Sequence, residues 1–339
     1  MRGRQVVLDR IGGVEAAALL VDGRLEDFLL DAPDRPRPGA VFGAVVDRTM
    51  AGQGGAMLHL GAGLTGYLRR ADGLDPGHYL AVQVTGYAEE GKAVPVRAKL
   101  QFKGRLAVVT PGAPGMNLSR RISDPGRRAE LTSLAEATAD PAFGLILRSA
   151  AADADRQQIA DEIAMLTEQA HRAATGAQSQ GQILDGPGPH AIAMRDWDGA
   201  MSRDELEQTG VLDLLVDLRR PEFSLGPARM IIEPTRALVA VDVDTGADTS
   251  RASGLKANIA AATELPRQLR LRGLGGQVVV DVAPMQKTHR PRVEAALRNA
   301  ASDDPGQITI AGWTPMGHLE LQRRRDRLPL VPRLKQMDI

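Results

Sequence analysis

Two apolar segments in the C-terminal third of the chain, each followed by aspartate, constrain the fold more than any other feature. ALVAVDVDTG at residues 237–246 and QVVVDVAPM at residues 277–285 both have the continuous apolar character of buried strands. Between them, residues 254–272 repeat apolar side chains at helical spacing and lead into GLGG, a helix C-cap signal. This order predicts a parallel strand pair joined by a right-handed helical crossover.

The acidic residues of this unit stand where the two strands end. Asp242 and Asp244 close the first strand, and Asp281 closes the second. Both carboxyl ends of a parallel pair lie at one edge of the sheet, where open α/β sheets bind ligands. Three crowded carboxylates would repel one another unless a hard cation such as Mg²⁺ bound them. The same residues also suit helix capping or loop anchoring, so the pattern alone leaves both interpretations open.

The remainder of the chain predicts several smaller parts. Residues 5–31 predict strand, turn and strand, with the turn at Asp22-Gly23, and the Pro-rich residues 31–40 predict a linker. Between residues 41 and 110, short apolar runs separated by glycine predict a small β-barrel, most simply an oligonucleotide/oligosaccharide-binding (OB) barrel. Residues 176–190 predict a loop or a linker. A preceding helix is predicted from one apolar face formed by Ile159, Ile163, Leu166 and Ala170.

Composition excludes several classes of function. The 339 residues include no cysteine, which excludes disulfides, cysteine zinc sites, iron–sulfur ligation and thiol catalysis. The chain has neither a G-x-S-x-G motif nor a P-loop, so a hydrolase triad and a P-loop nucleotide site are unsupported. Because it has no membrane-length apolar run and no signal-peptide pattern, we expect a cytoplasmic protein without membrane contact.

The net charge of zero hides an uneven distribution. From Leu265 onward, 13 Lys and Arg residues stand against 7 Asp and Glu residues, so this part is basic and the preceding part acidic. A basic surface suits an anionic partner such as RNA, although a solvated helical surface accounts for the same composition. Aromatic residues make up only 3% of the chain, which argues mildly against extensive base stacking.

In its motifs, the chain resembles the bacterial ribonuclease E/G family. ALVAVDVDTGADTS and the later ELPRQLRLRGLGGQVVVDVAPM are similar to the catalytic region of that family. VDGRLEDFLLD resembles its opening hairpin, and SRRI at residues 119–122 and GLILRSA at residues 144–150 resemble its 5′-sensor region. The resemblance covers most of the chain and is weakest across residues 173–227.

The resemblance implies an α/β fold of several subdomains. Residues 1–35 and 173–227 would form a ribonuclease H-like subdomain. Residues 36–102 would form an S1-type RNA-binding β-barrel (an OB-fold) inserted in it. Residues 103–172 would form the 5′-sensor region, and residues 228–339 a C-terminal DNase I-like α/β catalytic domain.

The resemblance also implies roles for individual residues. Asp242 and Asp281 match two magnesium-binding aspartates, and Asp244 stands where the family usually has a catalytic asparagine. Aspartate keeps an oxygen acceptor there, but it removes the amide donor and adds a charge. The 5′-phosphate sensor would comprise Arg148, Ser149 and Val108. The RNA-binding residues of the barrel would be Tyr67, Met57 and Lys92.

Some of these residues have plain structural interpretations as well. Met57 replaces a stacking aromatic and, by itself, is typical of core filler. Arg148 could be an exposed charge at the end of a strand. The arginines that end the 254–272 helix would attract the RNA backbone or would pair with acids of the fold; they are Arg267, Arg270 and Arg272.

The function implied is a Mg²⁺-dependent endoribonuclease. It would cut single-stranded, A/U-rich RNA to 5′-phosphate and 3′-hydroxyl ends, in maturation of rRNA precursors and decay of mRNA. The family joins protomers through a zinc held by a Cys-x-x-Cys pair, so no zinc link is expected here and a homodimer would need another interface. The alternatives are an RNA-binding protein of the same fold with lost or weakened cleavage and, from the carboxylates alone, a small-molecule phosphohydrolase.

Overall fold

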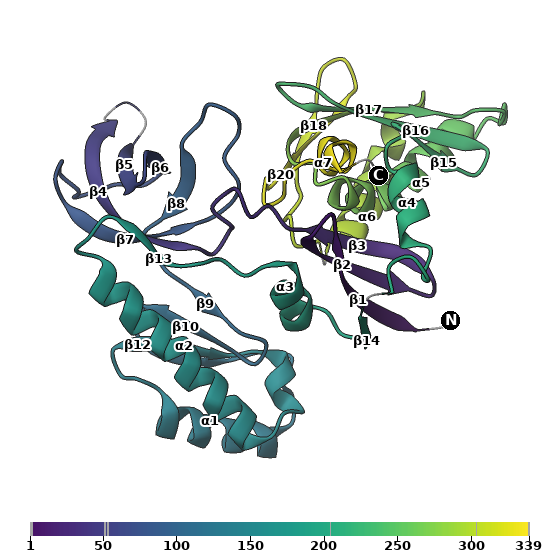
Figure 1. The fold of residues 1–339 in the computed structure, drawn as a ribbon. Coiled ribbons are helices and arrows are strands. Elements are labelled where there is room, and N and C mark those ends of the chain that lie inside the picture. Colours follow the sequence, from purple (N-terminus) through teal and green to yellow (C-terminus); the bar gives the residue numbers. More distant parts are fainter. Residues whose placement is uncertain (1–2, 51, 53, 204, 303, 338–339) are drawn as a thin grey trace. The chain divides into compact units, whose positions relative to one another are not determined.

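The computed structural model describes residues 3–50, 52, 54–203, 205–302 and 304–337. The chain forms two compact units (Figure 1). The flanking unit comprises Met1–Asp31 and Asp198–Ile339, and the inserted unit comprises Ala32–Trp197. The four-part division implied by the resemblance is finer than these two units and stays a prediction. No helix in the described ranges is both long and apolar enough to cross a bilayer.

The first part of the inserted unit is a closed barrel of five strands (Figure 1). The strands are β4 (Val41–Met50), β5 (Gly55–Gly61), β6 (Leu64–Leu68), β7 (Tyr79–Val84) and β8 (Val94–Arg97). They pair in the order β4-β5-β6-β8-β7, and β7 closes back onto β4. Apolar side chains such as Leu58, Leu60 and Val82 fill the interior. The predicted barrel is confirmed, and its five closed strands are consistent with an S1/OB-type subdomain.

A second sheet of the inserted unit packs against helices. Its strands pair in the order β11-β12-β10-β9. They are β9 (Phe102–Lys103), β10 (Ala107–Pro111), β11 (Gly115–Leu118) and β12 (Phe143–Leu147). The helices are α1 (Pro125–Thr138), the 3₁₀ helix η1 (Ser149–Ala152), α2 (Arg156–Gly176) and α3 (Pro189–Asp196). As predicted, α2 buries Ile159, Ile163, Leu166 and Ala170 against this sheet.

The loop predicted over residues 176–190 is wrong in its middle and at its ends, because α2 includes Gly176 and α3 begins at Pro189. Four of its residues form β13 (Gly181–Leu184), which pairs antiparallel with β4 at the edge of the barrel sheet. The strand is short, the polar residues Gln180 and Asp185 flank it, and only Ile183 and Leu184 in it are branched and apolar. Its pairing partner is far away in the sequence, so no local pattern indicated it.

The flanking unit contains a four-stranded sheet in the order β14-β1-β2-β3. Its strands are β1 (Arg4–Ile11), β2 (Val14–Val21), β3 (Arg24–Leu30) and β14 (Ala200–Arg203). The turn at Asp22-Gly23 is confirmed, with φ of 51° and 79° at the two residues. A second turn at Gly12-Gly13 divides the first predicted strand into two. Helix α4 (Val211–Asp217) packs on this sheet through Val211 and Leu215.

The flanking unit also contains a six-stranded sheet in the order β15-β16-β17-β18-β20-β19 (Figure 1). Its strands are β15 (Glu222–Leu225), β16 (Ala228–Pro234), β17 (Val239–Asp244), β18 (Gly276–Asp281), β19 (Thr309–Trp313) and β20 (Leu319–Arg323). The remaining helices are α5 (Ser253–Leu271), the 3₁₀ helix η2 (Lys287–His289), α6 (Arg290–Ala301) and α7 (Leu330–Gln336).

The predicted strand–helix–strand unit is confirmed in this sheet. β17 and β18 are parallel neighbours, and α5 connects them within one residue of the predicted bounds. One face of the sheet is buried against α5 and α6, where Val241 and Val280 meet Ala261 and Leu265. The other face, called the open face here, carries the alternate strand residues. Their solvent exposure makes it the face on which chemistry can occur.

Candidate active site at the ends of β17 and β18

Two aspartates lie side by side where the parallel strands end. The register pairs Asp242 of β17 directly with Asp281 of β18. Neighbouring strands are about 4.8 Å apart, so the two side chains on the open face are immediate neighbours. Both residues are exposed, and the Asp281 side chain keeps 68% of its accessible surface. Two solvent-facing carboxylates at this edge can bind a cation or a polar substrate.

The third aspartate is engaged with a neighbouring strand. Asp244 lies opposite Arg229 of β16, whose Nε and Nη2 are 3.0 and 2.7 Å from its Oδ2. Its Oδ1 accepts the backbone N–H of Gly246 at 2.8 Å. These groups, first the Gly246 N–H and then Arg229, hold the pKa of Asp244 below its ordinary value. The expectation that all three carboxylates need a cation to relieve their repulsion is therefore corrected, because Arg229 already neutralises one of them.

The donors left for a metal are the carboxylates of Asp242 and Asp281. Across the described ranges, no group of three or more His, Asp or Glu side chains is arranged to hold a metal ion. A preformed protein cage is thus not present in those ranges. Mg²⁺, however, usually binds through one or two carboxylates and keeps several waters, which substrate phosphates can replace. The pair of neighbouring oxygen donors fits that mode of binding.

A buried amide fixes the chain that leaves the site. Asn258 of α5 is 1% exposed, and its Nδ2 donates to the Ala283 carbonyl at 2.9 Å. Its Oδ1 accepts the Ala283 N–H at 2.9 Å, so both backbone polar groups two residues after Asp281 are held. Sequence reasoning missed this residue. The available signal was an amide between Ala257 and Ala261, among apolar residues of the helix at core spacing.

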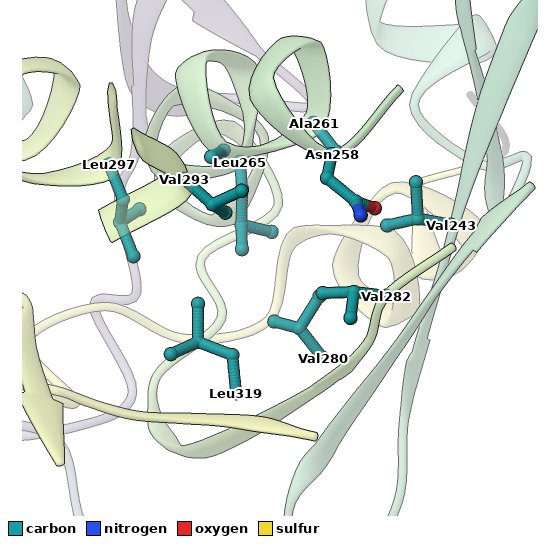
Figure 2. A pocket seen from close by; sticks show the side chains of 10 residues that line it. Val243, Asn258, Ala261, Leu265, Val280, Val282, Val293, Leu297 and Leu319 are labelled. Carbon is teal, nitrogen blue, oxygen red and sulfur yellow. The ribbon is translucent and has the colours of Figure 1, made fainter. Parts of the chain in front are cut away.

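Figure 2 shows Asn258 at the margin of a small cavity between α5, α6 and the sheet. The other side chains that line the cavity are apolar, including Val243, Val280 and Leu319. Val243 and Val280 alternate with the aspartates along β17 and β18, so the carboxylates point to the opposite face. The cavity is therefore part of the core and not the place where the chemistry would occur.

His318 is a second residue that the sequence did not indicate. It lies in the turn between β19 and β20, where the Thr314 N–H donates to its carbonyl. Its Nε2 is 3.7 Å from Oδ1 of Asp281. The two residues are 37 positions apart, and only the pairing of β18 with β20 brings them together. Protonated His318 would place a positive charge beside the exposed aspartate.

The residues proposed for the 5′ sensor lie together in the inserted unit. Val108 of β10 and Arg148, just after β12, project from one face of their sheet, and Ser149 follows as an exposed residue. Arg148 donates to the Gly104 carbonyl at 2.5 Å and to Asp196 at 3.1 Å. The guanidinium is thus paired within its own unit, and it is not simply an exposed charge at a strand end.

Asp196, the carboxylate that pairs with Arg148, also pairs with Arg195. Burial would raise the pKa of Asp196, but hydrogen bonds and charge from Arg195 and Arg148 outweigh burial and leave the pKa below its ordinary value. Close by, Glu162 accepts the backbone N–H groups of residues 105–107 at 2.6–3.1 Å. The backbone donors at this corner are therefore occupied by a side chain of α2.

Of the three residues proposed to bind RNA in the barrel, the structure brings Met57 and Tyr67 together but not Lys92. Met57 and Tyr67 lie directly opposite each other on β5 and β6, and both are half-buried on the outer surface. The interpretation of Met57 as core filler is wrong, because the barrel interior is reached by its neighbours Ala56 and Leu58. Lys92 lies in the loop between β7 and β8, where it is exposed and pairs with Glu89 at 2.5 Å.

The three arginines at the end of α5 serve the fold. Arg267 binds Glu264 at 2.8 Å, and Arg270 binds the buried Asp304 at 2.7 Å. Arg272 is 4% exposed, and burial lowers its pKa to about 10, with a further contribution from the charge of Arg267. Of the two interpretations drawn from the sequence, pairing with acids of the fold describes Arg267 and Arg270, whereas Arg272 binds the side chain of Gln268 and the carbonyl of Arg220.

Fold and site together define a mixed α/β protein with a closed five-stranded barrel and an acidic edge on a parallel strand pair. A sequence profile of the ribonuclease E/G family matches residues 101–200 and 202–326. The match includes the second sheet of the inserted unit and all three aspartates. The chain therefore belongs to the ribonuclease E/G family.

Curated relatives agree with this assignment. Ribonuclease E of Synechocystis sp. is 27% identical over 311 residues, covering 76% of this chain and 46% of the relative. Ribonuclease G of Escherichia coli K12 is 26% identical over 302 residues, covering 74% of this chain and 60% of the relative. Ribonuclease E of Buchnera aphidicola is 36% identical over 101 residues. The chain thus spans about half the length of the curated relatives it matches.

Proposed function

We propose that this chain is an endoribonuclease that uses Mg²⁺ bound by Asp242 and Asp281. The observation that carries the proposal is their direct opposition on parallel strands, at the exposed end of the sheet, in a member of the ribonuclease E/G family. Relatives of this family are named ribonucleases E and G. A small-molecule phosphohydrolase would leave the barrel without a role.

The roles of the side chains follow from their contacts. Asp242 and Asp281 would hold Mg²⁺, which, when bound, offsets charge on a phosphodiester and lowers the pKa of a bound water. Asp244 would orient the attacking water or the phosphate, and the N–H of Gly246 together with Arg229 keeps it ionised for this role. Asn258 holds Ala283 and thereby the strand end that carries Asp281.

The proposed substrate is single-stranded, A/U-rich RNA, cut to 5′-phosphate and 3′-hydroxyl ends during maturation of rRNA precursors and decay of mRNA. Tyr67 would stack on a base, and Met57 opposite would give an apolar but weaker contact. Arg148 and Ser149 would read a 5′-phosphate, with Val108 bordering them. We place the activity in the cytoplasm and propose the ribonuclease H-like, S1, 5′-sensor and DNase I-like layout of the family.

Cleavage of a labelled A/U-rich RNA, carrying either a 5′-phosphate or a 5′-hydroxyl, tests the proposal. With Mg²⁺ we expect cutting by the wild type, strong loss in Asp281→Asn, and no loss in Asp213→Asn, which removes an exposed carboxylate of α4. EDTA should abolish the cutting. Equal rates for the two aspartate variants would refute the assignment of the site. Faster cutting of the 5′-phosphorylated RNA, lost in Arg148→Ala, would support the sensor.

The alternative is an RNA-binding protein of the same fold with lost or weakened cleavage. The ion pair between Asp244 and Arg229 favours it, because both oxygens of the carboxylate already have partners. RNA binding without Mg²⁺-dependent cutting, in the same two RNAs, would select this alternative.

A further inference from the structure

The open face of the six-stranded sheet is acidic. Following the register outward from Asp242 and Asp281, the strand residues on this face include six carboxylates: Glu222, Glu233, Asp242, Asp244, Asp281 and Glu320. Among the described strand residues of this face, only one is a cation, Arg229. Among these strand side chains, the carboxylates repel an approaching phosphodiester and Arg229 attracts it.

The guanidinium of Arg229 is only partly used within the protein. Its Nε–H and one Nη2–H point to Oδ2 of Asp244. Its Nη1 lies 3.9 Å from Glu222, beyond hydrogen-bond distance. Since guanidinium carries five N–H donors, three remain without a hydrogen-bond partner among the described residues. The side chain is also 47% exposed, so these donors are accessible from the open face.

We propose that Arg229 is a phosphate-binding residue of this site and that Asp244 orients it. One edge of the planar guanidinium is fixed by Asp244, and the other edge presents its N–H groups to a backbone phosphate of the RNA strand. A bidentate contact of this kind is the usual way in which arginine recognises phosphate. This inference adds a residue role to the proposed function. It rests on that function only because it takes RNA as the ligand.

The pairing has a physical rationale. Because Asp244 adds a negative charge to an acidic face, a cation directly opposite removes the repulsion that this charge would exert on RNA. The carboxylate in turn limits the rotamers of a long side chain, so less conformational freedom is lost when a phosphate binds. Asp244 and Arg229 thus form an oriented ion pair on the same face as the exposed pair Asp242 and Asp281, and Glu222 lies 3.9 Å from Nη1 of the same guanidinium.

Binding without cleavage tests the inference. We would measure the anisotropy of a short, labelled, 5′-hydroxyl A/U-rich RNA in EDTA over a series of salt concentrations. Arg229→Ala should weaken binding about tenfold, as expected for loss of a charge-assisted contact at an exposed site, and should reduce the slope of log K against log salt by about 0.7. Arg229→Lys should keep the slope and lose affinity, because it keeps the charge but not the planar fork.

The matched control is Arg298→Ala. Arg298 is also an exposed, ion-paired arginine, bound to Glu294 at 2.6 Å, but it lies on α6 behind the other face of the sheet. If Arg229→Ala and Arg298→Ala change affinity and slope equally, the inference is overturned. In an Asp244→Ala background, the effect of Arg229→Ala should shrink to about threefold. A full tenfold effect there would overturn the orienting role of Asp244.

The two proposals fail in distinguishable ways. A wild type that cuts RNA normally, with Arg229→Ala unaffected in both binding and KM, overturns the inference and leaves the nuclease. A wild type that binds RNA through Arg229 but never cuts it overturns the nuclease and leaves the inference. Near-ultraviolet circular dichroism of each variant verifies that the sheet is intact before affinities are compared.

Discussion

Replacement of Asn258 by alanine removes the side chain that holds the strand end after Asp281. The variant leaves the buried N–H and C=O of Ala283 without the two hydrogen bonds they make with Asn258. An unsatisfied buried polar group costs about 1–3 kcal/mol. The gain in helix propensity from Asn to Ala returns only about 0.5 kcal/mol. We therefore expect the free energy of unfolding of the flanking unit to fall by about 2–5 kcal/mol.

The chain has two tryptophans, one in each unit, so tryptophan fluorescence can report the unfolding of one unit at a time. In a Trp197→Phe background, Trp313 is the only tryptophan, and it packs against the core of the six-stranded sheet. Urea unfolding followed by its fluorescence reports on the sheet that Asn258 supports. With a urea dependence of about 2 kcal/mol per molar, the midpoint should fall by about 1–2.5 M.

Asn299→Ala is the matched control. It makes the same asparagine-to-alanine change within a helix, but Asn299 is an exposed residue of α6. Its midpoint should stay within about 0.3 M of the parent, given that exposed substitutions change stability by about 0.5 kcal/mol or less. If Asn258→Ala proved as mild as the control, the two hydrogen bonds would not be holding the strand end, and the reasoning would be refuted.

Three further outcomes follow from contacts described for each unit. Asp304→Ala should cost the flanking unit about 3–5 kcal/mol in urea unfolding, because it removes the buried carboxylate that is hydrogen-bonded to both Arg323 and Arg270; a loss below about 1 kcal/mol would contradict this. Glu162→Ala should lower the inserted unit's stability by about 2–4 kcal/mol, read from Trp197 fluorescence, since three backbone N–H groups lose their acceptor. Arg229→Ala should raise the pKa of Asp244 toward 3.8 in a ¹³C carboxyl NMR titration. Because folding lowers the pKa of Asp244, its ionised carboxylate contributes fully to stability above pH 3.8, and this contribution disappears as the pH falls through the folded pKa. An unchanged pKa in Arg229→Ala would assign the whole shift to the Gly246 N–H.

The elements that the sequence predicted are those with a strong local pattern. The strands that end at Asp242 and Asp281 are continuous apolar runs, and the helix between them has an apolar face of regular period, so their type and order could be stated in advance. Asp22-Gly23 specifies its turn because both positions need a positive φ. The proximity of Asp242 and Asp281 then follows from parallel pairing alone.

The contacts that give the site its charge balance could not be stated in advance. Arg229 and Asp244 meet because β16 and β17 pair in one particular register, and a shift by one residue would put them on opposite faces. His318 reaches Asp281 through a strand that comes much later in the chain. Met57 could be assigned to the core or to the surface from its chemistry, and only the alternation along β5 decides it.

The parallel pairing of β1 with β14 has a consequence for how the protein is made. Gln5 pairs with Ala200, so β1, which is synthesised before the inserted unit, waits for this neighbour until the whole inserted unit has left the ribosome. A folded inserted unit shortens the effective loop between these strands and lowers the entropic cost of closing it. Translation order therefore favours completion of the inserted unit first. By the same geometry, a protease that nicks a loop of residues 32–197 leaves the two parts of the flanking unit joined by non-covalent pairing.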